Sequence, residues 1–240
     1  SWIIFKINCN ITPNIDITIS AACAGSITTC CDITSSGTYT LANNISSGGS
    51  CINITASDVE LDCANFSILY GSSTSNTRGV NASTVSRINI SNCNIIAPNA
   101  TPTNRVGIAF RNVNDSLVRN STVNNSLAGT AALFTIVART TIQDSTLDGR
   151  NSTGGTVRWL TNTNGTLRNS TIYASLFGSF SIEAGSGNRM LTSTIDDSGN
   201  NRAVFLGTAA SSTTLANSTI TCRGNGFGLL MQTSNNIIEN

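Results

Sequence analysis

A short phrase recurs at a nearly constant distance through the second half of this 240-residue chain. Its clearest copies place Asn-Ser-Thr or Asp-Ser-Thr between short apolar stretches, as in Leu117–Val123, Thr141–Leu147 and Thr166–Ile172. The other copies are Ile88–Ile95, Arg189–Ile195 and Thr214–Ile220. Counted from the central Cys or Ser of each copy, from Cys93 to Ser218, the steps are 28, 24, 25, 23 and 25 residues.

A repeat of this length is typical of a solenoid, in which each repeat buries its apolar face only by stacking on its neighbours. The apolar stretches are short, rich in β-branched residues and flanked by Asn, Ser, Thr and Gly, a pattern that predicts short strands separated by turns. A helical solenoid is disfavoured because the chain contains one lysine and lacks helix-forming residues at 3.6-residue spacing.

A second phrase lies about half a repeat away from the first. Its copies are Arg105–Phe110, Ala131–Phe134, Thr156–Leu160, Asn201–Leu206 and Gly226–Met231. Each repeat therefore contains at least two strands, and about 25 residues leave room for three strands and three turns. We predict an all-β fold, a right-handed parallel β-helix of seven to eight coils in which successive coils rise by roughly 4.8 Å.

Equivalent side chains of successive coils should stack directly on one another. We expect Phe110, Phe134, Trp159 and Phe205 to form an aromatic stack inside the tube. A parallel aliphatic row is expected from Val123, Leu147, Ile172, Ile195 and Ile220.

The first coils resemble a known repeat family. The stretches Gly37–Ile45, Cys51–Ile54 and Val59–Cys63, followed by the Asn-Ser-Thr coils, are similar to the NosD-like parallel β-helix repeats of secreted and surface proteins of archaea and bacteria. The resemblance covers about residues 30–240 and implies the β-helix fold. It does not imply an activity, because enzymes, tailspikes, adhesins and surface-layer proteins share this coil.

The N-terminal residues 1–29 differ from the coils that follow in 30–240. Neither a leader of the usual form nor a stretch long enough to cross a membrane is visible there, and we interpret Ser1 as a mature N-terminus. The apolar stretch Trp2–Ile7 is expected to cap the first coil or to exchange with a neighbouring subunit. A further strand is expected at Asn14–Ser20.

Eight cysteines in a chain without histidine favour disulfides in an oxidising compartment over a Cys/His zinc site. They are Cys9, Cys23, Cys30, Cys31, Cys51, Cys63, Cys93 and Cys222. Eight cysteines allow 105 connectivities. The pairs we favour are Cys63 with Cys93, and Cys30 or Cys31 with Cys51. Cys222 is isolated in the sequence, which leaves open a buried free thiol or an intermolecular disulfide.

Fourteen Asn-x-Ser/Thr sequons are candidate N-glycosylation sites. They are Asn10, Asn44, Asn53, Asn65, Asn81, Asn89, Asn99, Asn114, Asn120, Asn124, Asn151, Asn164, Asn169 and Asn217. Because Asn, Ser and Thr are abundant throughout the chain, chance accounts for many of these sequons, and they support secretion only mildly.

The C-terminal residues 236–240 match the start of another coil phrase and lack the polar cap that solenoid ends usually carry. Open strand edges pair readily with another chain, and a head-to-tail contact that does not close produces a filament. The candidate assembly residues are Trp2, Ile4, Phe5, Cys222, Ile237 and Ile238. A truncated chain would explain the same feature.

We identify no catalytic, metal-binding or cofactor-binding set. Glycoside hydrolysis needs two converging carboxylates, but the candidates are sparse: Asp144 and Asp148 in one coil, the adjacent Asp196 and Asp197, and the isolated Glu183. Histidine-dependent catalysis is excluded by composition. A calcium site at Asp144 and Asp148 has too few ligands. Arg119 and Arg168 occupy equivalent positions in the repeat. Their presence is therefore better explained by repetition of the coil than by a role as the catalytic base of a lyase.

Thirteen basic and twelve acidic residues leave no strong charge that would favour nucleic acid or a membrane surface as a partner. We therefore expect a structural, non-enzymatic protein of the extracellular space or cell surface, glycosylated and assembled with copies of itself. The alternatives are a carbohydrate-binding adhesin module and, less favoured, a polysaccharide lyase or hydrolase. Aromatic residues that could bind sugar are Trp2, Tyr39, Tyr70 and Tyr173.

Overall fold

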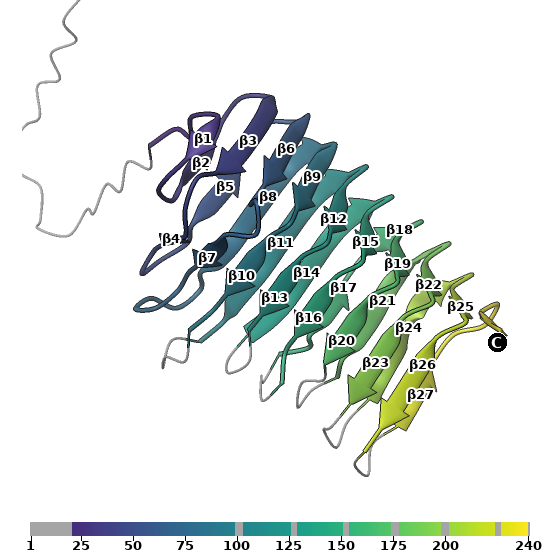
Figure 1. Cartoon of the computed structure of the whole chain (residues 1–240). Coiled ribbons are helices and arrows are strands. Elements are labelled where there is room, and N and C mark those ends of the chain that lie inside the picture. The colour runs from purple at the N-terminus through teal and green to yellow at the C-terminus, as the bar shows by residue number, and fades with distance from the viewer. Residues whose placement is uncertain are drawn as a thin grey trace, which may run out of the picture.

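The protein is a stack of coils in which every strand pair is parallel. The computed structural model describes residues 21–98, 103–125, 129–150, 154–173, 178–197, 202–223 and 227–239. Three parallel sheets form a β-solenoid of about eight turns, each of about 25 residues. The coils follow one another along a single axis from the N-terminal to the C-terminal end (Figure 1). The expected all-β parallel β-helix is thus confirmed.

Each coil contributes one strand to sheet A, then one to sheet B, then one to sheet C. Sheet A contains β2 (Cys31–Ile33), β5 (Ile52–Ile54), β8 (Arg78–Ser86), β11 (Arg105–Asn114), β14 (Gly129–Ala138), β17 (Val157–Trp159), β21 (Phe180–Ser186), β24 (Arg202–Ser211) and β27 (Phe227–Met231), with β18 (Asn162–Thr163) beside β14. Sheet B contains β1 (Ser26–Ile27), β3 (Gly37–Leu41), β6 (Val59–Asp62), β9 (Ile88–Ser91), β12 (Leu117–Arg119), β15 (Thr141–Gln143), β19 (Thr166–Arg168), β22 (Arg189–Leu191), β25 (Thr214–Ala216) and β28 (Ile237–Glu239). Sheet C contains β4 (Ile45–Ser46), β7 (Ser67–Leu69), β10 (Asn94–Ile96), β13 (Thr122–Asn124), β16 (Thr146–Asp148), β20 (Thr171–Tyr173), β23 (Thr194–Asp197) and β26 (Thr219–Cys222).

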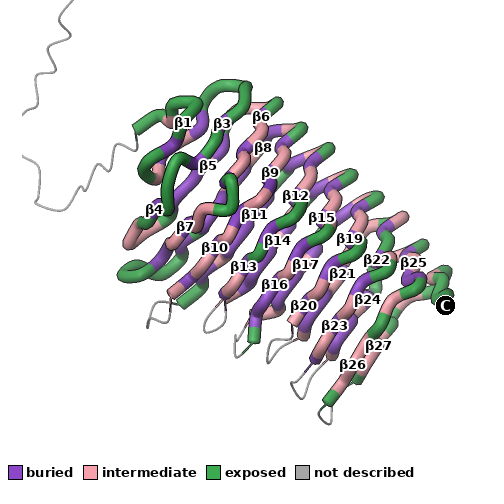
Figure 2. Tube along the Cα trace, in the orientation of Figure 1, coloured by how far each residue is buried: buried purple, intermediate pink, exposed green. Residues whose placement is uncertain are grey.

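The core is a set of rows that run along the axis, and Figure 2 shows the buried positions repeating from coil to coil. The expected aliphatic row is confirmed, since Val123, Leu147, Ile172, Ile195 and Ile220 pair in register along sheet C. On sheet A the row runs through Phe110, Phe134 and Trp159. The first two rings lie 5.2 Å apart between centroids.

The sequence placed Phe205 in this stack, and that assignment is wrong. Register pairs Phe205 with Ser181, whereas Ile182 and Leu206 continue the buried row from Trp159. Successive side chains of a strand point to opposite faces, so an alignment error of one residue moves a side chain from the core to the surface. Phe205 therefore lies on the outer face of sheet A and is half-buried.

The recurring phrase forms the corner between sheets B and C. The residue before the central Ser or Cys has a left-handed backbone in every copy, with φ between 46° and 54°. These residues are Asn92, Asn120, Asp144, Asn169, Thr192 and Asn217. Asn and Asp tolerate this conformation better than other non-glycine residues, which explains their place in the phrase.

The central serine satisfies two backbone groups at this corner. The Ser145 hydroxyl donates to the Gln143 carbonyl at 2.7 Å and accepts the Ser121 N–H of the preceding coil at 3.2 Å. The same pair of contacts links successive coils through Ser121, Ser170, Ser193 and Ser218. Since Ser121, Ser145, Ser170 and Ser193 are buried, their hydroxyls satisfy backbone groups that have little access to water.

This corner also accounts for several sequons. At Asn120, Asn169 and Asn217 the Asn adopts the left-handed turn, the Ser bridges coils and the Thr begins a sheet C strand. The exposed sequon residues are Asn44, Asn65, Asn120, Asn164, Asn169 and Asn217, whereas Asn53, Asn81, Asn89, Asn114 and Asn124 are half-buried. Asn10, Asn99 and Asn151 lie outside the described residues. Folding alone explains these three corner sequons, and N-glycosylation stays a prediction.

Three disulfides fasten the first coils. Cys63–Cys93 and Cys30–Cys51 are pairings favoured by the sequence, and the third bond joins Cys23 to Cys31. Within the described part of the chain Cys222 is the one free thiol, and it is half-buried. Cys9 lies outside that part, as do Trp2, Ile4, Phe5 and the strand expected at 14–20. From residue 21 onward the segment is tied to its own chain, because β1 pairs with β3.

We expect Ser121→Ala to lower the free energy of unfolding by about 1–3 kcal/mol, because the buried N–H of Cys93 loses its acceptor. Thr122→Ala, at the exposed neighbouring position, serves as the control and should change stability by less than about 0.5 kcal/mol. Urea unfolding followed by circular dichroism measures both. Equal effects of the two substitutions would contradict the role assigned to the corner hydroxyl.

Candidate functional site

Three adjoining hollows form a groove along the outer face of sheet A. Their volumes are about 230, 350 and 320 Å³ in order along the axis. Leu133 lines both the first and the second, while Gly154 and Arg158 line both the second and the third. The groove therefore crosses successive coils.

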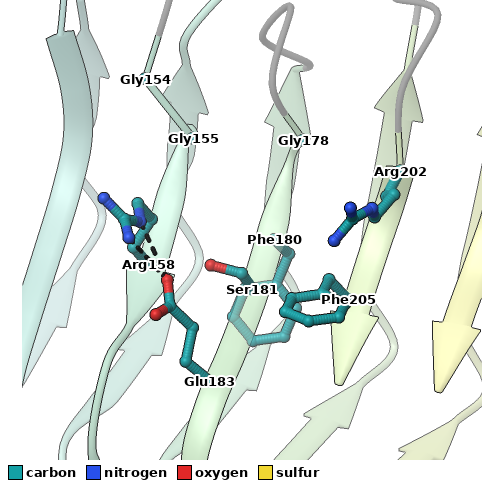
Figure 3. Close-up of a pocket in the computed structure, with 9 residues that line it drawn as sticks. All are labelled: Gly154, Gly155, Arg158, Gly178, Phe180, Ser181, Glu183, Arg202 and Phe205. Atoms are coloured by element: carbon teal, nitrogen blue, oxygen red, sulfur yellow. Dashed lines mark hydrogen bonds and ion pairs between the residues drawn. The ribbon is translucent and has the colours of Figure 1, made fainter. Parts of the chain in front are cut away.

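The third hollow has the most varied chemistry (Figure 3). Arg158, Ser181 and Phe205 occupy one outward row on β17, β21 and β24, so three consecutive coils present a guanidinium, a hydroxyl and an aromatic ring. Glu183 accepts a hydrogen bond from Arg158 Nη2 at 2.6 Å. The guanidinium of Arg202 lies over the ring of Phe205, 4.8 Å from its centroid.

Gly154, Gly155 and Gly178 line this hollow. A Cβ atom on Gly154 would lie 2.7 Å from the carbonyl oxygen of Gly129 in the coil below. Gly178 has φ of +121°, a backbone conformation that side chains with a Cβ rarely adopt. Both positions thus require glycine for reasons of backbone geometry.

The arrangement suits recognition better than bond cleavage. An aromatic face packs against the apolar face of a sugar ring, while the guanidiniums, hydroxyl and carboxylate can bind sugar hydroxyl or carboxylate groups. Hydrolysis of a glycoside by the usual route requires two carboxylates flanking the bond. Among the residues lining this hollow Glu183 is the one carboxylate, and it is bound to Arg158.

The other carboxylates considered from the sequence do not converge on this groove. Asp144 is exposed at a corner, whereas Asp148 is nearly buried on sheet C and paired with Arg150 at 2.6 Å. Asp196 pairs with Arg223 at 2.8 Å, and its neighbour Asp197 is buried. Within the described ranges no group of three Asp, Glu, Cys or His residues could hold a metal ion.

The aromatic residues considered as sugar contacts lie elsewhere. Tyr39 and Tyr70 are buried in the core, and the ring of Tyr173 is covered by the guanidinium of Arg150 at 4.7 Å. Trp2 lies outside the described residues. Phe205, Ser181 and Arg202 were not identified as site residues from the sequence. Alternate residues of a strand face outward, and this alternation along β21 and β24, which is visible in the sequence, could have indicated them.

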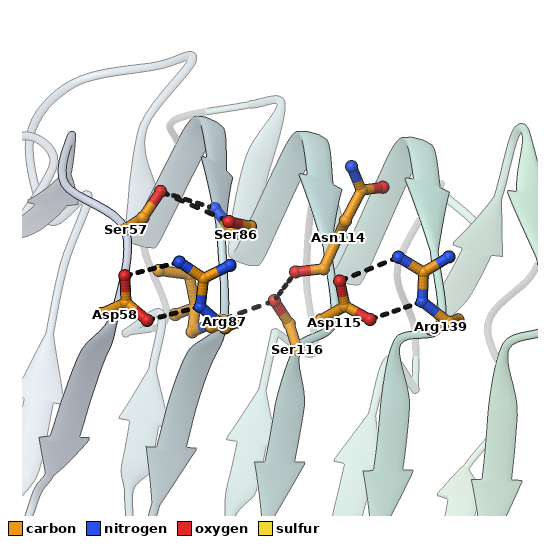
Figure 4. A network of polar contacts seen from close by, with 9 residues as sticks. Ser57, Asp58, Ser86, Arg87, Asn114, Asp115, Ser116 and Arg139 are labelled. Carbon is orange, nitrogen blue, oxygen red and sulfur yellow. Dashed lines mark hydrogen bonds and ion pairs between the residues drawn. The ribbon is translucent and has the colours of Figure 1, made fainter.

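A charged row marks the corner between sheets A and B (Figure 4). Arg87 pairs with Asp58 and Arg139 pairs with Asp115, each through two nitrogens of the guanidinium. All four residues have left-handed backbones, with φ between 52° and 59°. The hydrogen bond from Arg87 lowers the pKa of Asp58, and the hydrogen bond from Arg139 lowers the pKa of Asp115.

Arg119 and Arg168, equivalent in the repeat, both lie exposed on the outer face of sheet B. Gln143 stands between them in the same row. They therefore lie on a different sheet from the groove of sheet A. Among the described residues no helix is long and apolar enough to span a membrane.

No family model matches the chain, and no curated protein matches it. Two solved structures are distantly similar in their β-helix fold. The Dettilon tailspike protein is 10% identical, with a TM-score of 0.39 over 89% of this chain and 60% of that one. The mannuronan C-5 epimerase A-module of Azotobacter vinelandii is 11% identical, with a TM-score of 0.36 over 88% of this chain and 86% of that one. The chain thus spans about 60% of the tailspike's length.

The lowered pKa values of Asp58 and Asp115 predict a loss of stability in acid. A depressed carboxyl pKa stabilises the fold above the unfolded value of about 3.9, and this contribution disappears as the pH falls through the folded pKa. We expect Arg87→Gln to raise the pKa of Asp58 toward its ordinary value. Carboxyl-detected NMR titration measures this change. Arg119→Gln is the control, and an equal shift from it would contradict the assigned pairing.

Proposed function

We propose that this chain is an extracellular β-helix scaffold that binds a linear glycan along the outer face of sheet A. The observation that carries the proposal is the outward row Arg158, Ser181 and Phe205, within a groove that crosses several coils. Because coils rise by roughly 4.8 Å, the row offers a contact at intervals comparable to the length of one sugar residue. No catalytic step is part of this proposal.

Three disulfides support the extracellular assignment, since such bonds are typical of oxidising compartments. N-glycans at exposed sequons such as Asn65 and Asn164 would be compatible with the groove, because neither residue lines it. Glycosylation is thus an accompanying proposal, and it requires none of the groove residues.

We expect Phe205→Ala to weaken glycan binding about tenfold or more, a loss of about 1.4 kcal/mol, because an aromatic contact at the centre of a site usually dominates its affinity. A glycan array identifies the ligand, and calorimetry measures the affinity.

Tyr173→Ala is the matched control, since Tyr173 is also a half-buried aromatic with a guanidinium over its ring, but on sheet C. It should leave the affinity unchanged. Unchanged binding by Phe205→Ala, with the fold intact by circular dichroism, would sink the sheet A proposal.

A second candidate function is end-to-end assembly into a filament, as expected from the sequence. It is favoured by the last described coil, where Met231 and Ile238 continue buried rows from Leu206 and Leu215 but are 43% and 57% exposed. A second copy stacked on this coil would cover both side chains and extend all three sheets. A further coil of the same polypeptide would cover them equally well, so the experiment must separate the two.

Sedimentation velocity over a range of concentrations should reveal oligomers of the chain that Ile238→Lys reduces to monomer. A buried lysine at the junction would remain unpaired and costly. Ile136→Lys is the control, because Ile136 is 55% exposed on the side of the solenoid and should leave assembly intact. Reductant, or Cys222→Ser, tests whether the free thiol contributes. A wild-type monomer at every concentration would remove this candidate.

A further inference from the structure

The outer face of sheet B changes in charge along the axis. Its early coils present Glu60 and Asp62, its middle coils present Arg119, Arg168 and Arg189, and its last described strand ends at the exposed Glu239, three rungs beyond Arg168. All three arginines are exposed. In a chain with only 10% charged residues, three like charges within four consecutive coils of one face form a distinct basic strip.

These three arginines have no carboxylate partner among the described residues. The ion pairs found there use other arginines, namely Arg87, Arg139, Arg150, Arg158 and Arg223. Arg168 donates instead to the amide oxygen of Gln143 through Nε, at 3.0 Å, and through Nη2. The Gln143 amide in turn donates to Asp144 at 2.9 Å. Because Gln143 is neutral, it positions the guanidinium of Arg168 without compensating the positive charge of Arg168.

The register fixes the spacing of the basic strip. Arg119, Gln143 and Arg168 lie on consecutive rungs of one row, so the two arginines are about 10 Å apart along the axis. Arg189 lies one rung beyond Arg168, in the neighbouring row of Leu117, Thr141 and Thr166. Together with Arg168 and Arg189, these three side chains line a shallow hollow of about 510 Å³.

The other charges around this hollow are few. Asp115 and Arg139 line it but form an ion pair with each other. Asp144 is exposed at the adjacent corner and is engaged by Gln143. The strip is therefore basic on balance, and its three arginines are available to an anionic partner.

We propose that this strip binds a linear polysaccharide that carries carboxylate groups, lying along the solenoid axis. Elsewhere in this protein Nε and Nη2 of Arg87 and Arg139 bind both oxygens of a carboxylate, which is the geometry that a guanidinium prefers. One such exposed pair contributes little, so a useful affinity requires a polymer that engages several arginines at once. A single-stranded nucleic acid fits less well, because among the described residues the outer face of sheet B has no aromatic side chain on which bases could stack.

The binding is tested with polygalacturonate as the probe and biolayer interferometry as the measurement. We expect the triple variant Arg119→Ser, Arg168→Ser, Arg189→Ser to bind at least about tenfold more weakly than wild type. The control triple variant, Arg87→Ser, Arg150→Ser, Arg223→Ser, removes the same net charge from other surfaces and should bind as wild type does. Raising the ionic strength from about 0.01 M to about 1 M shortens the Debye length from about 30 Å to about 3 Å and should abolish wild-type binding.

Two single variants sharpen the test without removing an arginine. Gln143→Glu places a carboxylate between Arg119 and Arg168 and should weaken binding by satisfying them internally. Leu191→Arg adds a cation on the rung after Arg168 and should strengthen binding. Neither side chain is buried, and the thermal midpoint checks that both variants fold.

Several outcomes would overturn the inference. Equal losses in the two triple variants would mean that net charge, not this face, binds the polymer. Tighter binding of dextran sulfate or of single-stranded RNA would identify another class of anion as the ligand. The inference is independent of the groove on sheet A, because Phe205→Ala should leave binding of polygalacturonate to the strip unchanged.

Discussion

The pairing of each residue with its equivalent in the next coil is the constraint on which the whole structure depends. It obliges every corner to place the same backbone conformation and the same buried polar group at the same position. At the corner between sheets B and C this requires a left-handed residue, such as Asn120, followed by a hydroxyl, such as that of Ser121. In an early coil Cys93 occupies the position that serine holds in later coils, and it forms a disulfide with Cys63. The same position thus links successive coils by a disulfide in one coil and by a serine hydroxyl in the others.

The same constraint separates core from surface. Inward positions must hold apolar side chains of compatible size, as Phe134 and Trp159 do, because interiors are closely packed. Outward positions carry no such requirement, and their rows can take any chemistry. Because core packing does not constrain the outward rows, sheet A can carry a groove lined by aromatic and charged side chains, and sheet B can carry the strip of arginines. A solenoid can thus present two different recognition surfaces on a single core.

Charged residues form ion pairs at the corner between sheets A and B, whereas within the described ranges the arginines on the outer face of sheet B form none. Along the corner between sheets A and B, Asp58, Arg87, Asp115 and Arg139 alternate in sign and neutralise one another. On the outer face of sheet B, Arg168 rests on a neutral amide instead. Pairing at the corner neutralises the charges of Arg87 and Arg139, whereas the arginines of the strip keep an uncompensated charge.

The sequence by itself determined the repeat, the parallel β-helix, the aliphatic row from Val123 to Ile220, and the pairing of Cys63 with Cys93. These follow from period and spacing, which are local properties of the chain. The tertiary structure alone decided that Phe205 faces outward and which arginines on the faces of the solenoid find a carboxylate. Each of these depends on the register between strands about 25 residues apart, where a shift of one residue exchanges the two faces of a strand. The coils that build the candidate groove were therefore predicted from the sequence, whereas its residues Ser181, Arg202 and Phe205 were recognised once the register was known.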